Sequence, residues 1–350
     1  MERLKHLENW LQAQVAEVPS QFPDQGYSIS LASADASFRR YFRVSTGKGS
    51  LIAMDAPPQH EDCEPFVNVA KLFSAAGVNV PAVLSQNLAD GFLLLSDLGN
   101  ITYLQALNEA IKNDPAGVTD KADSLYGDAI AALLKIQVAS KPGILPEYDE
   151  ATLLGELNLF PEWYLGRYLQ VVPNVEQRAE LDKVFSLIVE NNLAQPKVFV
   201  HRDYHSRNLM VIDPNPGILD FQDALYGPVT YDLVSLFKDA YIRWDEERIL
   251  DWLIRYWEQA RKLGLPVARD FADFYRDFEW MGVQRHIKVL AIFSRLNYRD
   301  GKSSYLNDLP LVEDYVRKAC ERYRELKPLL TLLDEWQGAK PSDANVGYSF

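Results

Sequence analysis

Short apolar stretches, separated by turn-forming residues, dominate the first hundred positions of the chain. They predict strands at Tyr27–Leu31, Tyr41–Val44, Leu51–Met54, Val80–Ser85 and Phe92–Leu95. Helical spacing predicts a short helix over residues 4–17 and another over Pro65–Ala76, which ends at Gly77. The first hundred residues therefore predict a small sheet with one or two helices.

After Gly99 the spacing of apolar residues becomes helical. Helices are predicted at Thr102–Lys112, Leu125–Gln137, Gln177–Asn191, Thr230–Trp244, Glu246–Leu263, Phe271–Asn297 and Leu311–Leu333. A strand-rich island interrupts them at 197–221. We expect an α+β protein with a sheet-containing N-lobe at 1–97 and a larger, mainly helical C-lobe at 98–350.

Composition is that of a soluble globular protein. Of 350 residues, 47% are hydrophobic and 24% charged, and no apolar run approaches the length of a membrane span. The charged N-terminus does not resemble a signal peptide. Two cysteines, Cys63 and Cys320, make no disulfide framework or metal site, so we expect a cytoplasmic protein.

The net charge of −13 argues against a general nucleic-acid surface, which needs a basic stripe. Solubility explains this charge, and attraction of cationic substrates is the alternative. We expect a monomer with small-molecule partners, without nucleic acid or membrane.

Candidate chemistry gathers in VFVHRDYHSRNLMVIDPNPGILDFQDA, residues 198–224. Two strands here, Asn208–Ile212 and Ile218–Phe221, are predicted to form a hairpin. Asn208 opens the first and Asp220 closes the second, so both lie at the same end of the hairpin. The loop carrying Asp203 enters that end, and local structure alone brings the three polar residues together.

A carboxylate beside an amide oxygen suits Mg²⁺, which keeps waters and binds phosphate oxygens. A second carboxylate could orient a hydroxyl and accept its proton, and phosphoryl transfer needs this combination. Asp and Asn are also ordinary turn residues, which is the competing interpretation for each residue alone. The His-x-Asp-x4-Asn order followed by Leu-Asp-Phe makes that interpretation improbable for the three together.

HRDYHSRN followed by LDFQ resembles the catalytic loop and metal-binding motif of protein kinases. Gln222 replaces their glycine, a later aspartate, Asp232, stands in GPVTYDLVSLF, and there is no room for an activation loop. The chain is therefore more similar to the aminoglycoside phosphotransferase (choline kinase-like) superfamily, which implies a two-lobed, protein-kinase-like fold, ATP and Mg²⁺ as cofactors, and a small-molecule acceptor.

By this resemblance Asp203 would be the catalytic base, and Asn208 and Asp220 would hold Mg²⁺. Arg207 could stabilise the transferring phosphate, with a plain surface arginine as the alternative. Asp232 would brace the catalytic loop, or would be an ordinary carboxylate near the N-cap of its helix.

On the nucleotide side, the small polar residues from Ser33 to Ser37 are the candidate phosphate-covering turn. FLLLSDLG at 92–99 resembles the hinge, where backbone groups near Leu95–Asp97 would bind adenine. The superfamily's strand lysine is missing, because Met54 stands at its expected position. Arg43 is one cation that could replace it, and the others nearby are Arg39, Arg40 and Lys48; a carboxylate near Glu61–Glu64 would be its partner.

SFRRYFRV, AMDAPP, FPEWYL and HRDYHSRNLM together resemble the bacterial anomeric sugar kinases of cell-wall (peptidoglycan) recycling. These transfer the γ-phosphate of ATP to the C1 hydroxyl of N-acetylmuramate and N-acetylglucosamine. An aromatic ring stacks on a sugar face, and polar side chains bind its hydroxyls. The predicted acceptor residues are Glu156, Asn158, Trp163, His205 and Asp223.

Each aromatic residue in 153–165 could instead belong to a helix with an apolar stripe. Three further alternatives concern function. The acceptor could be an aminoglycoside, choline, homoserine or ketosamine. The protein could be a non-catalytic pseudokinase, or a hydrolase that uses the same carboxylates and metal.

Overall fold

The structure, a computed structural model, describes residues 2–17, 26–34 and 38–338. The chain divides into two compact units. Unit 1 comprises Met1–Ala139 with His201–Ala224, and unit 2 comprises Ser140–Val200 with Leu225–Phe350. The strand-rich island of the sequence is thus shared between the two units.

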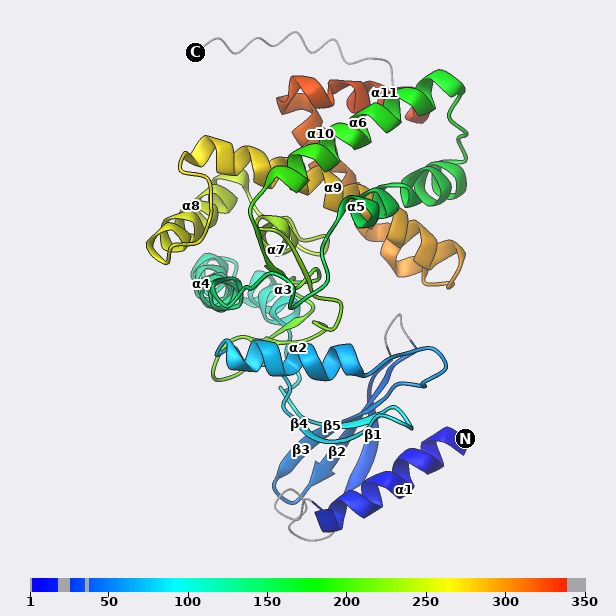
Figure 1. The fold of residues 1–350 in the computed structure, drawn as a ribbon, viewed down its shortest axis with the longest axis vertical. Coiled ribbons are helices and arrows are strands. Elements are labelled where there is room, and N and C mark those ends of the chain that lie inside the picture. Colours follow the sequence, from blue (N-terminus) through cyan, green and yellow to red (C-terminus); the bar gives the residue numbers. More distant parts are fainter. Residues whose placement is uncertain (1, 18–25, 35–37, 339–350) are drawn as a thin grey trace. The chain divides into compact units, whose positions relative to one another are not determined.

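Unit 1 contains a five-stranded antiparallel sheet in the order β1-β2-β3-β5-β4. Its strands are β1 (Ser28–Ala34), β2 (Arg40–Thr46), β3 (Gly49–Asp55), β4 (Val83–Asn87) and β5 (Phe92–Ser96). Helices α1 (Glu2–Glu17) and α2 (Glu64–Ala75) lie on opposite sides of it (Figure 1). Leu7 and Leu11 of α1 pack on alternate residues of the central strands, such as Phe42 and Ala53, so strand alternation defines an α1 face and an opposite face.

The rest of unit 1 is α3 (Tyr103–Asn113), α4 (Val118–Val138) and a small hairpin of β7 (Leu209–Met210) and β8 (Gly217–Ile218). Leu209 pairs with Ile218, and the Leu219 amide donates to the Asn208 carbonyl oxygen at 2.9 Å. Asn215, in the hairpin turn, donates to Asp128 of α4 and to Tyr103 of α3. The hairpin is therefore anchored to two helices of its own unit.

Unit 2 is mostly helical. Its elements are α5 (Glu150–Leu157), a π-helix η1 (Pro161–Leu169), α6 (Val175–Ala194), the strand pair β6 (Lys197–Val200) and β9 (Leu225–Pro228), α7 (Tyr231–Phe237), α8 (Glu246–Lys262), α9 (Phe271–Tyr298), η2 (Ser303–Asp308), α10 (Leu309–Arg322), η3 (Arg324–Leu326) and α11 (Lys327–Gln337). The middle of α9 is buried on nearly every side, from Phe278 to Ala291. It forms the centre of this unit's core.

Most predicted elements are confirmed, and two helix predictions are wrong in extent. The helix predicted at Thr230–Trp244 ends at Phe237, because the Tyr241 amide bonds to the Asp239 side chain in a turn of its own. The helix predicted at Leu311–Leu333 is two helices separated by η3. Pro328 opens the second, and proline cannot continue a preceding helix.

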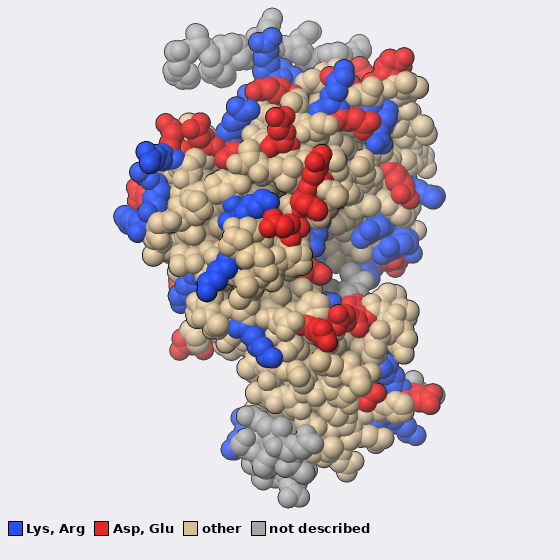
Figure 2. All heavy atoms as spheres, viewed as in Figure 1, with Lys and Arg blue, Asp and Glu red and all other residues tan. Residues whose placement is uncertain are grey.

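Charged side chains of both signs are intermixed on the face drawn in Figure 2. Cys63 and Cys320 are both buried and free. Within the described residues, no helix has the length and hydropathy that a membrane span requires. The predicted lobe boundary at residue 97 stays a prediction.

Candidate active site

The loop from Asp203 to Asn208 is held by short-range hydrogen bonds within unit 1. The carbonyl oxygen of Asp203 accepts from the His205 amide at 3.0 Å and from Asn208 Nδ2 at 3.0 Å. The Asn208 amide donates to the His205 carbonyl oxygen at 2.9 Å. These bonds bring Asp203, His205 and Asn208 together in the order that the sequence predicts.

Asp220 lies beside Asn208. Nδ2 of Asn208 is 3.3 Å from Asp220 Oδ2, and Gln222 Nε2 donates to Asp220 Oδ1 at 2.9 Å. Asp220 has a φ of 63°, a left-handed conformation that costs energy for a residue with a Cβ and is common at functional sites. This conformation turns the chain at the end of the hairpin, where the Asp220 carboxylate lies within hydrogen-bond distance of the Asn208 side-chain amide.

The donor set fits a magnesium ion. A carboxylate and an amide are the oxygen-bearing groups that Mg²⁺ takes alongside waters and phosphate oxygens. No group of three or more His, Cys, Asp or Glu side chains among the described residues could hold a metal. Asp220 and Asn208 could contribute two ligands to such an ion.

His201 supports the loop as an uncharged side chain. It is fully buried, and Nδ1 accepts a hydrogen bond from the Asp203 amide at 3.3 Å. Burial lowers the pKa of His201 to about 4, although the negative charge of Asp203 acts in the opposite direction. A neutral ring can accept this bond at physiological pH.

The hinge prediction falls at the end of β5, where Leu95 pairs with Ile52 of β3. Asp97, just beyond, accepts from Arg43 Nε at 2.6 Å, from Ser50 Oγ at 2.6 Å and from the Gly99 amide at 2.9 Å. Burial raises the pKa of the Asp97 carboxyl, but the hydrogen bonds outweigh it and leave the pKa below its usual value. Arg43 of β2 thus binds the residue just beyond the end of β5.

The phosphate-covering turn is only partly described. Ser33 lies in β1, and Ser37 lies outside the described residues. Their roles remain predictions.

The four candidate cations of the sheet occupy different places. Arg40 belongs to the α1 face, where it and Arg3 of α1 pair with the buried Asp55. Arg39 immediately precedes β2 and is outside the strand pairing. Its Nη2 lies 2.8 Å from Glu61 Oε2, and both side chains are almost buried, at 11% and 12% exposed.

Lys48 lies in the exposed turn between β2 and β3. Sequence reasoning expected a carboxylate near Glu61–Glu64 as the partner of the replacing cation, but it could not choose among the four cations.

Two of the predicted acceptor residues lie in unit 1. His205 belongs to the loop from Asp203 to Asn208, while Asp223 is exposed and accepts from Gln222 Nε2 at 3.2 Å. Arg207, the predicted phosphate-stabilising residue, is exposed.

The other three lie in unit 2. Glu156 of α5 is buried, and its two oxygens bond to different partners, the Tyr148 hydroxyl and Lys288 of α9. Asn158 is exposed and accepts from Arg178 at 3.1 Å. Trp163 is half-buried in the π-helix. Sequence reasoning missed Lys288 and Tyr148 because nothing local marks them as partners of Glu156.

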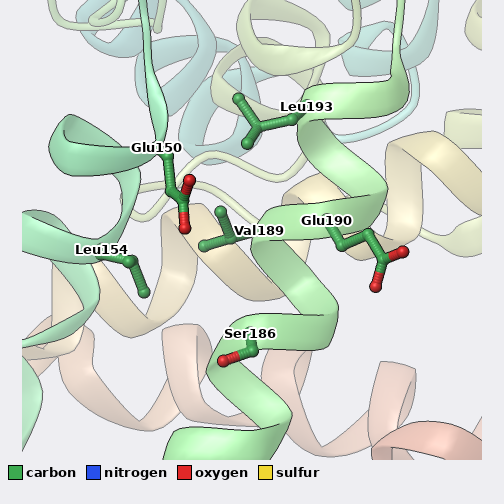
Figure 3. A pocket seen from close by; sticks show the side chains of 6 residues that line it. All are labelled: Glu150, Leu154, Ser186, Val189, Glu190 and Leu193. Atoms are coloured by element: carbon green, nitrogen blue, oxygen red, sulfur yellow. The ribbon is translucent and has the colours of Figure 1, made fainter.

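A pocket between α5 and α6 is lined by Glu150, Leu154, Ser186, Val189, Glu190 and Leu193 (Figure 3). Two carboxylates and three aliphatic side chains make up most of this lining. It includes none of the residues predicted for catalysis, nucleotide or acceptor.

The family model of the phosphotransferase enzyme family (APH) matches residues 28–271. The chain belongs to this phosphotransferase family. The match spans the sheet, the catalytic loop and the hairpin. The predicted enzyme class, a kinase, is thereby confirmed, and the resemblance drawn from HRDYHSRN and LDFQ is correct.

Relatives of known name are similar over the whole chain. A protein of Neisseria meningitidis serogroup B, named N-acetylmuramate/N-acetylglucosamine kinase, is 47% identical over 100% of both chains. A protein of the same name from Pseudomonas aeruginosa is 48% identical over 95% of this chain and 96% of its own.

Solved structures of other kinases and phosphotransferases share the fold. The choline kinase LicA of Streptococcus pneumoniae superimposes with a TM-score of 0.58 over 89% of this chain and 99% of its own, at 12% identity. The aminoglycoside phosphotransferase APH(2'')-Ib, bound to ADP, superimposes with a TM-score of 0.54. The superposition covers 87% of this chain and 97% of that one, at 13% identity. The predicted fold class, α+β and protein-kinase-like, is confirmed.

Proposed function

We propose that this phosphotransferase moves the γ-phosphate of ATP to the anomeric C1 hydroxyl of N-acetylmuramate and N-acetylglucosamine. The chemistry rests on one observation, the gathering of Asp203, Asn208 and Asp220 at the end of the β7–β8 hairpin. The acceptor rests on relatives 47% and 48% identical that carry the name of this activity. The product, a sugar 1-phosphate, would serve the reuse of cell-wall sugars in the cytoplasm.

Asp203 orients the C1 hydroxyl and accepts its proton as the oxygen bonds to the γ-phosphorus. The bond from that phosphorus to the bridging oxygen breaks, and ADP leaves. Mg²⁺, held by Asn208 and Asp220, would neutralise charge on the phosphates. Arg207 would add a positive charge near the transferring group. His201 keeps the loop in shape and does no chemistry.

We propose that Arg39, rather than Arg43, supplies the cation that the missing strand lysine would supply. Glu61 holds the Arg39 guanidinium at 2.8 Å, and a carboxylate near Glu61–Glu64 is the partner expected for this cation. The Arg43 guanidinium is already bound to Asp97 and to the Gly99 carbonyl oxygen. A guanidinium can bind two phosphate oxygens in parallel.

We propose that the N-lobe comprises residues 1–97 and the C-lobe 98–350, and that the protein acts as a monomer. Ser33, Ser37, Leu95 and Asp97 would contact the nucleotide. The acceptor would contact Asn158, Trp163, His205 and Asp223, while Glu156, bound on both oxygens, would support them.

The test is ATP consumption by the purified protein with Mg²⁺ and a panel of acceptors. The panel contains N-acetylmuramate, N-acetylglucosamine, glucose, choline, homoserine and kanamycin. We expect turnover with the two N-acetyl sugars alone, and phosphorus and carbon NMR should place the phosphate on C1. Turnover with choline, homoserine or kanamycin alone would refute the acceptor and leave the transfer chemistry intact. ATP binding without any turnover would favour a pseudokinase.

A further inference from the structure

Arg285, in the middle of α9, is a buried arginine without a counter-charge. Its side chain belongs to the core of unit 2, with the residue only 4% exposed. Nε and Nη1 have no hydrogen-bond partner, and Arg285 takes part in none of the ion pairs found among the described residues. A guanidinium in this state has lost most of its hydration without a replacement, which costs several kcal/mol.

Other buried cations of unit 2 are paired. Lys238 contacts Glu279, and Lys288 lies 3.0 Å from Glu156 Oε1. Both lysines are 8% exposed, close to the burial of Arg285. The fold therefore supplies carboxylates to its buried lysines, and the lack of one at Arg285 is a specific departure.

Polar groups surround Arg285 along the same helix. Lys288, three residues later, lies on an adjacent part of the helix surface and binds Glu156 of α5. Gln284 donates to the Leu153 carbonyl oxygen of α5, while its own Oε1 is buried without a partner. Gln284 and Lys288 thus face α5, the helix from which the sequence predicted acceptor contacts, and Arg285 lies beside them in the sequence of α9.

His286 adds no charge to this set. Burial lowers its pKa to about 3, helped by the positive charges of Arg285 and Lys238. Its ring is therefore neutral at physiological pH, and it bonds through Nε2 to the Lys238 carbonyl oxygen. Of the cations classed as buried among the described residues of unit 2, Arg285 is the one with no bound acid.

We infer that Arg285 binds the carboxylate of an acidic sugar and so determines how well the enzyme uses N-acetylmuramate. This inference rests on the proposed function. N-acetylmuramate is N-acetylglucosamine with a lactyl ether, and the lactyl carboxylate is the one anionic group by which the two acceptors differ. The planar guanidinium can hold both carboxylate oxygens, which a neutral sugar cannot provide.

The test compares three acceptors, namely N-acetylmuramate, its methyl ester and N-acetylglucosamine, in wild type and Arg285→Gln. The ester keeps the shape of the acid and removes its charge. We expect Arg285→Gln to lower kcat/KM for the acid on the order of 10- to 100-fold, the effect of losing hydrogen bonds to a charged group. The values for the ester and N-acetylglucosamine should change less than threefold.

Arg285→Lys should recover part of the kcat/KM for N-acetylmuramate that Arg285→Gln loses. Arg299→Gln, at the exposed end of α9, is the matched control and should leave kcat/KM for all three acceptors unchanged. Thermal unfolding separates binding from structure. Removing an unpaired buried charge should leave Tm unchanged or raise it, whereas a structural arginine would lower Tm when replaced.

An equal loss for all three acceptors, or no loss for the acid, would overturn the inference. The proposed function fails separately, if wild-type protein phosphorylates neither N-acetyl sugar.

Discussion

The catalytic loop of unit 1 and the α5–α9 contact of unit 2 are built in opposite ways. In the loop, Asn208 reaches Asp203 and Asp220 across 5 and 12 residues of sequence. In unit 2, Gln284 reaches Leu153 across 131 residues, and Lys288 binds Glu156 of the same helix. A site formed by residues close in sequence can be recognised as a sequence motif. A site formed by helices far apart in sequence can be recognised only in the folded structure.

The two regions also use charge differently. The Asp220 carboxylate has hydrogen-bond donors on both oxygens, and Asp203 and Asp220 are only partly buried. The charges of α9 are buried and mostly paired, so their replacement should change stability as well as activity. The following variants test this distinction, in order of decreasing effect.

Asp220→Asn should abolish most catalysis, because it removes the only carboxylate beside Asn208 that we assign to the metal. We expect kcat/KM to fall roughly 1,000-fold or more, with a steeper dependence on Mg²⁺ concentration. Steady-state kinetics at several Mg²⁺ concentrations measure both the fall in kcat/KM and its dependence on Mg²⁺. Asp213→Asn, in the exposed turn of the same hairpin, is the control. Activity of Asp220→Asn within tenfold of wild type would contradict the metal assignment.

Arg39→Ala should raise the KM for ATP roughly 10- to 100-fold, the cost of a charge-assisted contact to phosphate. Glu61→Gln should raise it less, because the arginine stays but loses its orientation. Arg40→Ala, on the α1 face, should lower stability and leave this KM unchanged. The assignment is wrong if Arg39→Ala and Arg40→Ala have the same KM for ATP.

Glu156→Gln should destabilise unit 2 by about 3 kcal/mol, because Lys288 then keeps a buried charge without its carboxylate. Urea unfolding measures the loss. The double variant Glu156→Gln with Lys288→Met should recover much of it. Unchanged stability together with a raised KM for the sugar would instead mean that Glu156 contacts the acceptor directly.

Asp277→Asn should stabilise the protein by about 1 kcal/mol at pH 8, because solvent screening of this partly exposed group reduces the roughly 3 kcal/mol that the full shift would give, and by much less at pH 4. Burial raises the pKa of Asp277 to about 6, against an unfolded value near 3.8. Between these values the folded state binds the extra proton, so wild type loses stability as pH rises from about 4 to 6. Asn does not titrate and can still accept from Asn191. A stability difference between the variant and wild type that stays constant from about pH 4 to about pH 8 would contradict the raised pKa of Asp277.

The sequence predicted the sheet and the catalytic hairpin well, because strand alternation and turn residues are local signals. β7 and β8 are shorter than expected, yet Asn208 still opens the hairpin and Asp220 still follows its second strand. The catalytic loop is predictable for the same reason, since the bonds that shape it stay within a few residues.

Tertiary contacts explain what the sequence did not reveal. The chain beyond Phe237 has a helical pattern, but Lys238 bonds to Glu279 and Asp239 forms a turn, which end the helix. β9 is short and contains Gly227 and Pro228, so it was missed. Arg285 lies in an ordinary buried stretch of α9, and only the missing counter-charge distinguishes it.

The central claim is that Asp203 accepts the proton of the acceptor hydroxyl, and Asp203→Ala tests it most directly. Turnover of Mg-ATP with N-acetylglucosamine would be measured together with the Kd for ATP. The account predicts a fall in kcat on the order of 100- to 10,000-fold, with ATP binding within a few-fold of wild type. Near-wild-type kcat in a variant that still binds ATP would contradict it.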